Sequence, residues 1–179
     1  DPRGGGRASA RETAARVVAG ALAMQVLGRL GITVRAYTEQ IGSVALDADY
    51  KSLDLSLDSI DANIVRCPDA AVAQAMVAEI GRARANGDSL GGIVRCVVSG
   101  VPAGLGDPVF GKLHARLASA MMSINAVKGF DYGLGFGFAG RRGSEVNDRF
   151  VPDGHGGIRT ATNYSGGIQG GISNGEDIC

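Results

Sequence analysis

Glycine is the residue type that most constrains how this chain can fold. Of the 179 residues, 29 are glycine, which is more than twice the usual share of about 7%. The glycines follow no strict period and stand beside apolar residues, so neither a collagen helix nor a disordered tract accounts for them. Because glycine loses much backbone entropy on folding, its clusters predict tight turns, close packing of layers or backbone contact with a ligand. The clusters lie at residues 4–6, 100–111, 129–143 and 154–175.

The first cluster runs directly into a predicted helix start. Ser9 and Glu12 have the Ser-x-x-Glu spacing of a capping box, in which each side chain satisfies a backbone N–H of the first turn. A helix N-terminus carries partial positive charge, and Arg7 and Arg11 add two guanidiniums. The pattern predicts an anion site for phosphate or carboxylate. A helix that simply begins after a flexible loop would explain the capping box alone.

Charge and hydropathy argue against nucleic acids and membranes as binding partners. Lys and Arg together number 18, as do Asp and Glu, whereas nucleic-acid-binding domains usually carry a basic excess. No stretch approaches the roughly 18 apolar residues of a membrane helix, and no segment resembles a signal peptide. We therefore expect neither a nucleic acid nor a membrane as partner.

The cysteines and histidines predict neither a metal site nor a disulfide framework. Cys67, Cys96 and Cys179 are odd in number and far apart, which favours free thiols in the reducing cytoplasm. The only histidines are His114 and His155, too few to favour a zinc site. We expect Cys96 to be buried in a strand, His114 to lie on a helix at or near the surface, and His155 to lie in an exposed loop.

Apolar periodicity predicts an alternation of helices and strands. Helical spacing covers residues 10–30, 70–85 and 112–122, and strand-like runs cover 32–41 and 93–99. Pro68 is expected in the first turn of the second helix, and the many alanines of the first helix predict close packing against a sheet. The order indicates an α/β layered domain without an internal boundary, and neither dinucleotide-binding nor P-loop glycine fingerprints occur.

Three further segments are less regular. The acidic segment 42–67 is expected to be a surface excursion or to carry a short helix. In residues 130–138, bulky apolar side chains alternate with aspartate and glycine, which predicts a strand with one aromatic face and one bare face. The remainder is expected to be mostly loop, with a backbone-lined pocket around the repeated Gly-Gly-Ile units of residues 163–177.

Several motifs occur in a defined order along the chain, at residues 4–13, 99–106, 122–129, 143–148 and 165–178. They read Gly-Gly-Gly-Arg-Ala-Ser-Ala-Arg-Glu-Thr, Ser-Gly-Val-Pro-Ala-Gly-Leu-Gly, Met-Ser-Ile-Asn-Ala-Val-Lys-Gly, Gly-Ser-Glu-Val-Asn-Asp and a glycine motif containing Gly-Gly-Ile-Gln-Gly-Gly-Ile-Ser. This set resembles the chorismate synthase family over essentially the whole chain.

The resemblance implies a fold and indicates which part of the family sequence this chain covers. The family fold is a β-α-β sandwich, in which helices lie between sheets that contain antiparallel strands, and it assembles as a homotetramer. Residues 1–179 would form a single, truncated domain corresponding to the middle of the family sequence. The start at Asp1 without methionine agrees with an internal segment.

The resemblance also implies a reaction. The family eliminates phosphate from 5-enolpyruvylshikimate 3-phosphate to give chorismate, in the shikimate pathway of aromatic amino-acid biosynthesis. It is a lyase that requires reduced FMN, although no net redox change occurs. Reduction of the flavin by the enzyme itself, with NADPH, is a property that varies within the family.

Residue by residue, the resemblance assigns binding roles but no catalytic ones. Arg11 would face the substrate or its phosphate. His114 and His155 match neither of the family's acid/base histidines, and the family's histidines and aspartate lie in motifs that this chain does not contain. Ala8 replaces a serine that is common in the family. The residues expected to contact FMN are Arg7, Ala8, Ser9, Asn125, Ala126 and Gly170.

Two other interpretations concern the chain in isolation. It could be a non-catalytic module that binds FMN or phosphate, because it keeps the glycine and arginine elements but lacks the proton-transfer groups. It could also be a structural fragment that binds nothing alone, because the rest of the pocket would be missing.

Overall fold

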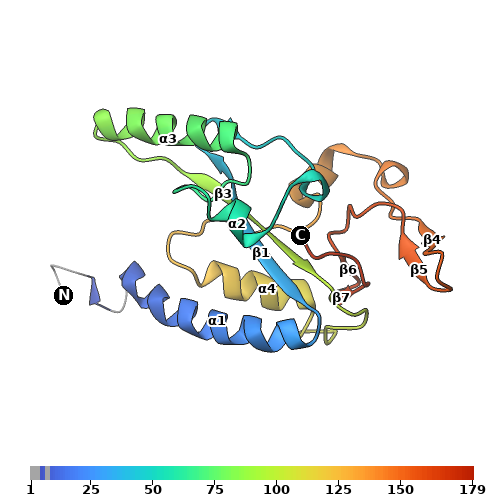
Figure 1. Ribbon diagram of the computed structural model, residues 1–179. Coiled ribbons are helices and arrows are strands. Elements are labelled where there is room, and N and C mark those ends of the chain that lie inside the picture. Colours follow the sequence, from blue (N-terminus) through green and yellow to red (C-terminus); the bar gives the residue numbers. More distant parts are fainter. Residues whose placement is uncertain (1–4, 7–8) are drawn as a thin grey trace. The chain divides into compact units, whose positions relative to one another are not determined.

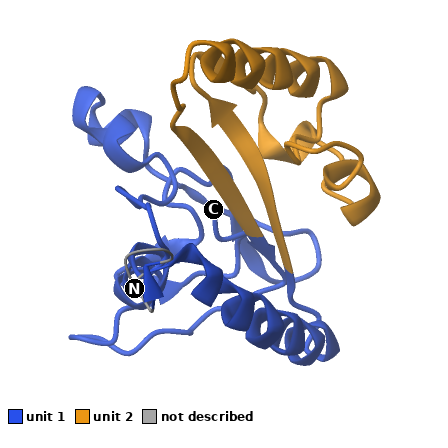
Figure 2. Ribbon diagram, turned by 90° about the vertical axis from the view of Figure 1, so that its left-hand side faces the viewer, with its two compact units in different colours: residues 1–33, 98–179 blue, residues 34–97 orange. Residues whose placement is uncertain are grey.

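The computed structural model describes residues 5–6 and 9–179 (Figure 1). The chain forms two compact units (Figure 2). The first unit comprises the described residues up to Thr33 together with Val98–Cys179, and the second is Val34–Val97. Both combine helices or helical turns with strands, so the chain is mixed α/β with antiparallel sheets.

The second unit is built on a three-stranded sheet in the order β2-β1-β3. β1 (Thr33–Ile41) and β2 (Val44–Ala45) form an antiparallel hairpin. The turn between them contains Gly42, whose φ of 55° lies in the left-handed region that glycine adopts without steric cost. β3 is Gly92–Ser99. The strands predicted at 32–41 and 93–99 are therefore confirmed to within one residue at each end.

Three helical elements join these strands. α3 (Ala70–Ala85) is the long one, and the acidic segment contains η3 (Tyr50–Ser52) and α2 (Leu57–Ile60), so its short helix is confirmed. Asp69 caps α3 by accepting a hydrogen bond from a first-turn N–H. Pro68 therefore precedes the cap, and its predicted place in the first turn is wrong.

The core of the second unit lies between α3 and the sheet. Tyr37, Cys67 and Met76 are its largest fully buried side chains. Burial raises the pKa of the Cys67 thiol, because desolvation disfavours the thiolate. Cys96 in β3 is half-buried rather than buried, and all three cysteines are free thiols.

The first unit contains two long helices that lie side by side (Figure 1). A short 3-10 helix, η2 (Ala10–Glu12), leads into α1 (Thr13–Arg29), and α4 (Leu113–Met122) follows the second glycine cluster. The predicted helices at 10–30 and 112–122 are thus confirmed apart from the 3-10 start of the first. The buried cluster of this unit consists of Ile32, Val101, Ile168 and Ile178, with Leu27, Val98, Leu113, Leu117 and Tyr132 packed against it.

The C-terminal part of the first unit contains two antiparallel two-stranded sheets, although loop was expected there. β4 (Phe150–Pro152) pairs with β5 (Ile158–Thr160), and β6 (Ile168–Gln169) pairs with β7 (Ile172–Ser173). A further 3-10 turn, η5, covers Gly143–Glu145. The strands are two or three residues long, which is too short for alternation to be visible in the sequence.

The strand predicted at 130–138 is wrong. The segment forms turns followed by the 3-10 helix η4 (Gly135–Gly140). Gly133 and Gly135 have φ of 61° and 51°, whereas a strand requires strongly negative φ. The N–H of Leu134 donates to the carbonyl of Tyr164 at 2.8 Å, so a contact 30 residues away replaces the pairing that a strand would need.

Helix α1 is apolar but has no buried residue within the described part of the chain. Within its own unit, Leu27 is the α1 residue that packs against the buried cluster. Four of its large side chains, Val17, Val18, Leu22 and Val26, are between 61% and 70% exposed, and the C-cap residue Leu30 is 69% exposed. A helix that is apolar on all sides is normally buried. The apolar side chains of α1 are instead exposed, as a helix that packs against another part of a protein would have them. No helix among residues 5–6 and 9–179 is both long and apolar enough to cross a bilayer.

Candidate functional site

The glycine loop before α1 turns the chain toward the helix start. Gly5 and Gly6 have φ of 69° and 53°, which only glycine adopts readily. The N–H of Ser9 then donates to the Gly6 carbonyl at 3.2 Å. The Ser9 hydroxyl accepts from the backbone N–H of Arg11 at 3.4 Å and from its guanidinium Nε at 3.1 Å. These bonds place the Arg11 guanidinium beside the helix start.

The predicted capping box is not formed. The N–H of Glu12 donates to the Ser9 carbonyl at 3.1 Å, which is a 3-10 turn, so the Ser9 hydroxyl caps Arg11 instead. The Glu12 carboxylate pairs with Arg16 at 3.1 Å. The pair has the i,i+4 spacing at which Glu and Arg meet on a helix surface, and this contact replaces the reach back to the Ser9 N–H.

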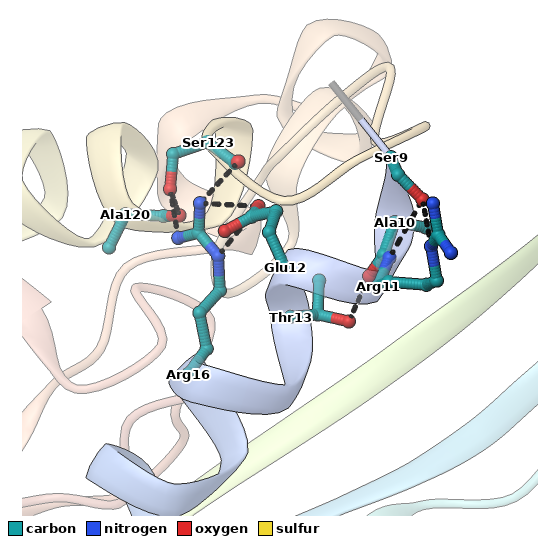
Figure 3. A network of polar contacts seen from close by, with 8 residues as sticks. All are labelled: Ser9, Ala10, Arg11, Glu12, Thr13, Arg16, Ala120 and Ser123. Atoms are coloured by element: carbon teal, nitrogen blue, oxygen red, sulfur yellow. Dashed lines mark hydrogen bonds and ion pairs between the residues drawn. The ribbon is translucent and has the colours of Figure 1, made fainter. Parts of the chain in front are cut away.

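Arg16 connects the start of α1 to the end of α4 (Figure 3). Its Nη1 donates to the Ser123 hydroxyl at 2.8 Å, and its Nη2 donates to the Ser123 carbonyl at 3.0 Å. Nε and Nη2 of the same guanidinium donate to one Glu12 carboxylate oxygen at 3.3 and 3.1 Å. The planar fork therefore uses all three of its nitrogens to join two segments that are 107 residues apart in sequence.

The turn after α4 contains a strained residue. Ser123 caps the helix, and two residues later the side chain of Asn125 is half-buried. Ala126 has a φ of 66°, a left-handed conformation that costs a residue with a Cβ about 1–2 kcal/mol. Non-glycine residues held in this way are concentrated at ligand sites. Among the described residues only Arg66 shares this non-glycine conformation, with a φ of 57°, and Ala126 is a residue that the resemblance assigns to FMN.

A glycine turn joins β6 to β7. Gly170 and Gly171 have φ of 61° and 89°, the pair of positive values found in type I′ hairpins. A Cβ on Gly171 would collide with the side chain of Lys112, whereas one on Gly170 would point into open space. Gly170 is exposed, so a ligand could approach its backbone closely.

Ser173 attaches this hairpin to the loop of the second glycine cluster. Its buried hydroxyl donates to the Pro102 carbonyl at 2.6 Å and accepts from the Leu105 N–H at 2.9 Å. The Ser173 carbonyl accepts from the Gly104 N–H at 2.8 Å. Two motifs that are far apart in sequence, 99–106 and 165–178, therefore form one hydrogen-bonded assembly.

A buried carboxylate organises the turn that leads into β6. Asp148 is 3% exposed and accepts three hydrogen bonds: from the Thr162 hydroxyl at 2.6 Å, the Tyr164 N–H at 2.8 Å and the Ser165 N–H at 2.7 Å. Burial alone would raise the pKa of this carboxyl, but these three bonds together with the Ser165 hydroxyl outweigh it and hold the pKa below its usual value. Asp148 is therefore held in its ionised form at neutral pH.

The two histidines have the environments that the sequence predicted. His114 is half-buried on α4 and stacks on Tyr132, with ring centroids 5.2 Å apart and an interplanar angle of 13°. His155 is exposed, and its backbone N–H donates to Asp153 at 2.7 Å. Together with the Gly157 N–H, this bond lowers the pKa of the Asp153 carboxyl. Within residues 5–6 and 9–179, no three His, Cys, Asp or Glu side chains gather as a metal site would require.

The predicted binding residues are thus placed in two groups. Arg16 links the segment of Ser9 and Arg11 to the turn of Asn125 and Ala126, and Gly170 lies in the hairpin held by Ser173. Arg7 and Ala8 lie outside the described residues.

Sequence reasoning missed four residues that hold these groups in place, namely Arg16, Ser123, Asp148 and Ser173. The i,i+4 spacing of Glu12 and Arg16 was a usable signal for one contact. Ser123, Asp148 and Ser173 lie within the motifs at 122–129, 143–148 and 165–178, but their partners are distant in sequence and no local pattern indicates those contacts.

Comparison with known proteins gives a consistent result. The sequence profile of the family described as Chorismate synthase matches residues 1–179. A crystal structure described as chorismate synthase superimposes on this chain with a TM-score of 0.89 at 35% identity, covering 96% of this chain and 55% of that one.

Curated relatives are closer in sequence. A chorismate synthase of Cytophaga hutchinsonii is 57% identical over 178 residues, and one of Phocaeicola vulgatus is 60% identical over the same length. Each match covers 99% of this chain but 49% of the relative, so the chain spans about half the length of these relatives. The profile covers every residue, and the chain therefore belongs to the chorismate synthase family.

Proposed function

We propose that these residues form the FMN- and phosphate-binding part of a chorismate synthase, which eliminates phosphate from 5-enolpyruvylshikimate 3-phosphate to give chorismate. In that reaction the C–O bond to the phosphate breaks, a proton leaves carbon, and a second C=C bond forms in the ring. Both FMN and the substrate carry phosphate, and the substrate also carries carboxylates. These anions need guanidiniums and oriented N–H groups.

The observation that carries the proposal is the joining of the two segments assigned to FMN. Ser9 and Arg11 stand at the start of α1, Asn125 and Ala126 follow α4, and Arg16 bonds to both sides. A binding site assembled from distant segments requires such a connection.

The residues present fit a flavin phosphate and its ring. The α1 start combines an arginine held by Ser9 with the positive end of a 17-residue helix. Gly170 is exposed and has open space where a Cβ would stand, so a flat group could lie against the peptide. Arg7, Ala8 and Ser9 are proposed contacts of FMN, together with Asn125, Ala126 and Gly170.

In this proposal the chain binds and orients, and the groups that move protons belong to the other half of the protein. Arg11 would hold an anionic group of the substrate, and its guanidinium favours the charge that develops on the departing phosphate. Reduced FMN, when bound, supplies electron density to that departure and recovers it afterwards. No residue among the 179 is assigned as catalytic acid or base.

The wider architecture is part of the same proposal. The exposed apolar surface of α1 supports a layered β-α-β arrangement in which the rest of the protein covers this helix. A homotetramer in the cytoplasm follows from the family resemblance, and the three free thiols accord with a reducing compartment.

The double substitution of Arg7 and Arg11 by alanine is expected to weaken FMN binding at least about tenfold. Each charge-assisted hydrogen bond to a phosphate is worth roughly 1.5–3 kcal/mol. Fluorescence titration of the complete gene product with FMN measures the change. The matched control replaces Arg29 and Arg84, two exposed arginines in the last turns of α1 and α3, and should leave the affinity unchanged.

The reaction itself is tested with the complete gene product, reduced FMN and the enolpyruvyl phosphate ester under anaerobic conditions. Formation of chorismate is the expected result. A folded, FMN-loaded protein that forms none would refute the proposal. The second candidate, a non-catalytic binding module, rests on the Arg11 and Gly170 elements alone, and FMN titration of the isolated 179 residues tests it.

A further inference from the structure

We infer that Arg16 is a positioning residue, which sets the separation between the two segments that hold FMN. This inference rests on the proposed function and assigns to Arg16 no contact with flavin or substrate. The guanidinium bonds Ser123 along one edge and Glu12 along the other (Figure 3). The two edges of one rigid plane therefore fix the end of α4 relative to the start of α1.

The contact at Ser123 constrains the turn that follows it. Ser123 donates its own hydroxyl proton to the Ala120 carbonyl at 2.6 Å, so its oxygen lone pairs remain for Arg16. The Ser123 carbonyl is one of the last acceptors of α4, where the helix dipole favours a cation. Three residues later Ala126 is held at a φ of 66°. A fixed Ser123 limits the relaxation of that strained turn.

The contact at Glu12 constrains the other segment. Glu12 ends η2 and directly follows Arg11, and its N–H already bonds to the Ser9 carbonyl. The ion pair with Arg16 therefore holds the short 3-10 turn that presents Ser9 and Arg11. Four donor contacts through one planar group require arginine, because the single ammonium of lysine cannot reproduce the fork.

The melting temperature and the FMN affinity distinguish a positioning role of Arg16 from a role in folding stability. The Arg16 and Glu12 side chains are 42% and 38% exposed, and exposed ion pairs add little to folding stability. Loss of Arg16 should hence barely change the melting temperature of the FMN-free protein. Misplacing binding groups by even about 1 Å can nevertheless cost up to ~100-fold in function.

The test measures FMN affinity and melting temperature of the complete gene product in parallel. Arg16→Ala is expected to raise the Kd for FMN by about 10- to 100-fold with the melting temperature of the FMN-free protein nearly unchanged, and Arg16→Lys should recover only part of the affinity. Ser123→Ala should weaken binding less, and adding it to Arg16→Ala should have little further effect, because both remove the same contact. Arg29→Ala, an exposed arginine at the other end of the same helix, serves as the matched control.

An unchanged Kd in Arg16→Ala overturns the inference. So does a loss of affinity accompanied by a large fall in melting temperature, because Arg16 would then be merely structural. The double variant Arg7→Ala/Arg11→Ala distinguishes a wrong positioning role for Arg16 from a wrong FMN site. If it weakens FMN binding while Arg16→Ala does not, only the positioning role is wrong. If neither variant affects binding, the proposed FMN site itself is wrong.

Discussion

Replacing Asp148 by alanine is expected to lower the free energy of unfolding by on the order of 4 kcal/mol. The substitution leaves three donors in a half-buried turn without their acceptor, at Thr162, Tyr164 and Ser165, and each unsatisfied group costs about 1–3 kcal/mol when it is buried. Urea denaturation of the complete gene product, followed by far-UV circular dichroism, measures the change.

Two further variants sharpen this measurement. Asp148→Asn keeps the shape but turns one acceptor into an NH₂ donor facing a donor, so an intermediate loss is expected. Asp153→Ala is the control, because Asp153 also accepts two backbone N–H bonds, from His155 and Gly157, but in a surface loop. If the Asp148 and Asp153 variants lose similar stability, burial of the Asp148 network is not the source of the effect.

The contribution of Asp148 to the free energy of unfolding should decrease at low pH. Its hydrogen bonds hold the native pKa below the usual value for aspartate, despite the opposing effect of burial. The carboxylate therefore stabilises the protein fully above the unfolded pKa of about 3.9, and this stabilisation is lost as the pH falls through the lower native pKa. The stability difference between wild type and Asp148→Asn should be constant from about pH 5 to 7 and shrink below about pH 4. A constant difference down to pH 2 would contradict the assignment.

Replacing Gly133 by alanine is expected to destabilise the protein by roughly 3 kcal/mol or more. The left-handed φ of 61° alone costs a Cβ-bearing residue about 1–2 kcal/mol. In addition, the new Cβ would collide with the backbone carbonyl of Tyr164 and with the peptide of Ser165 and Gly166. Backbone atoms held by their own hydrogen bonds cannot move aside as a flexible side chain can, so the effects add.

Gly140 provides the matched control for this substitution. It lies two residues beyond this segment, at the end of η4, and a Cβ there would meet no atom within 4 Å. Gly140→Ala should leave the melting temperature unchanged or slightly raised, because alanine restricts the unfolded chain more than glycine. The comparison also decides between turn and strand for residues 130–138, since a strand would accept alanine at Gly133 as readily as Gly140 does. Equal melting temperatures for the two variants would exclude the turn.

Asp148 and Gly133 illustrate why sequence reasoning succeeded in some regions and failed in others. The helices and the longer strands follow from periodicity and end signals, such as the cap at Asp69 and the left-handed Gly87 after α3. Alternation of large residues with glycine in 130–138 is compatible with both a strand and a series of glycine turns. The positive φ at Gly133 goes together with the close approach of the Tyr164 backbone. Tyr164 is 31 residues away, so no pattern among neighbouring residues reveals it.

The sequence by itself determined the positions of α1, α3 and α4, the β1 and β3 strands and, through the order of its motifs, membership of the chorismate synthase family. These features depend on neighbouring residues, whose spacing fixes helical faces, caps and positive-φ sites. Only the tertiary structure decided that Glu12 pairs with Arg16 rather than capping the helix. It also decided that Arg16 donates hydrogen bonds to Ser123 and that Asp148 accepts hydrogen bonds from three residues. Such pairings depend on which distant segments the packed core brings within hydrogen-bond distance. A side chain with several possible local partners gives no indication of that choice.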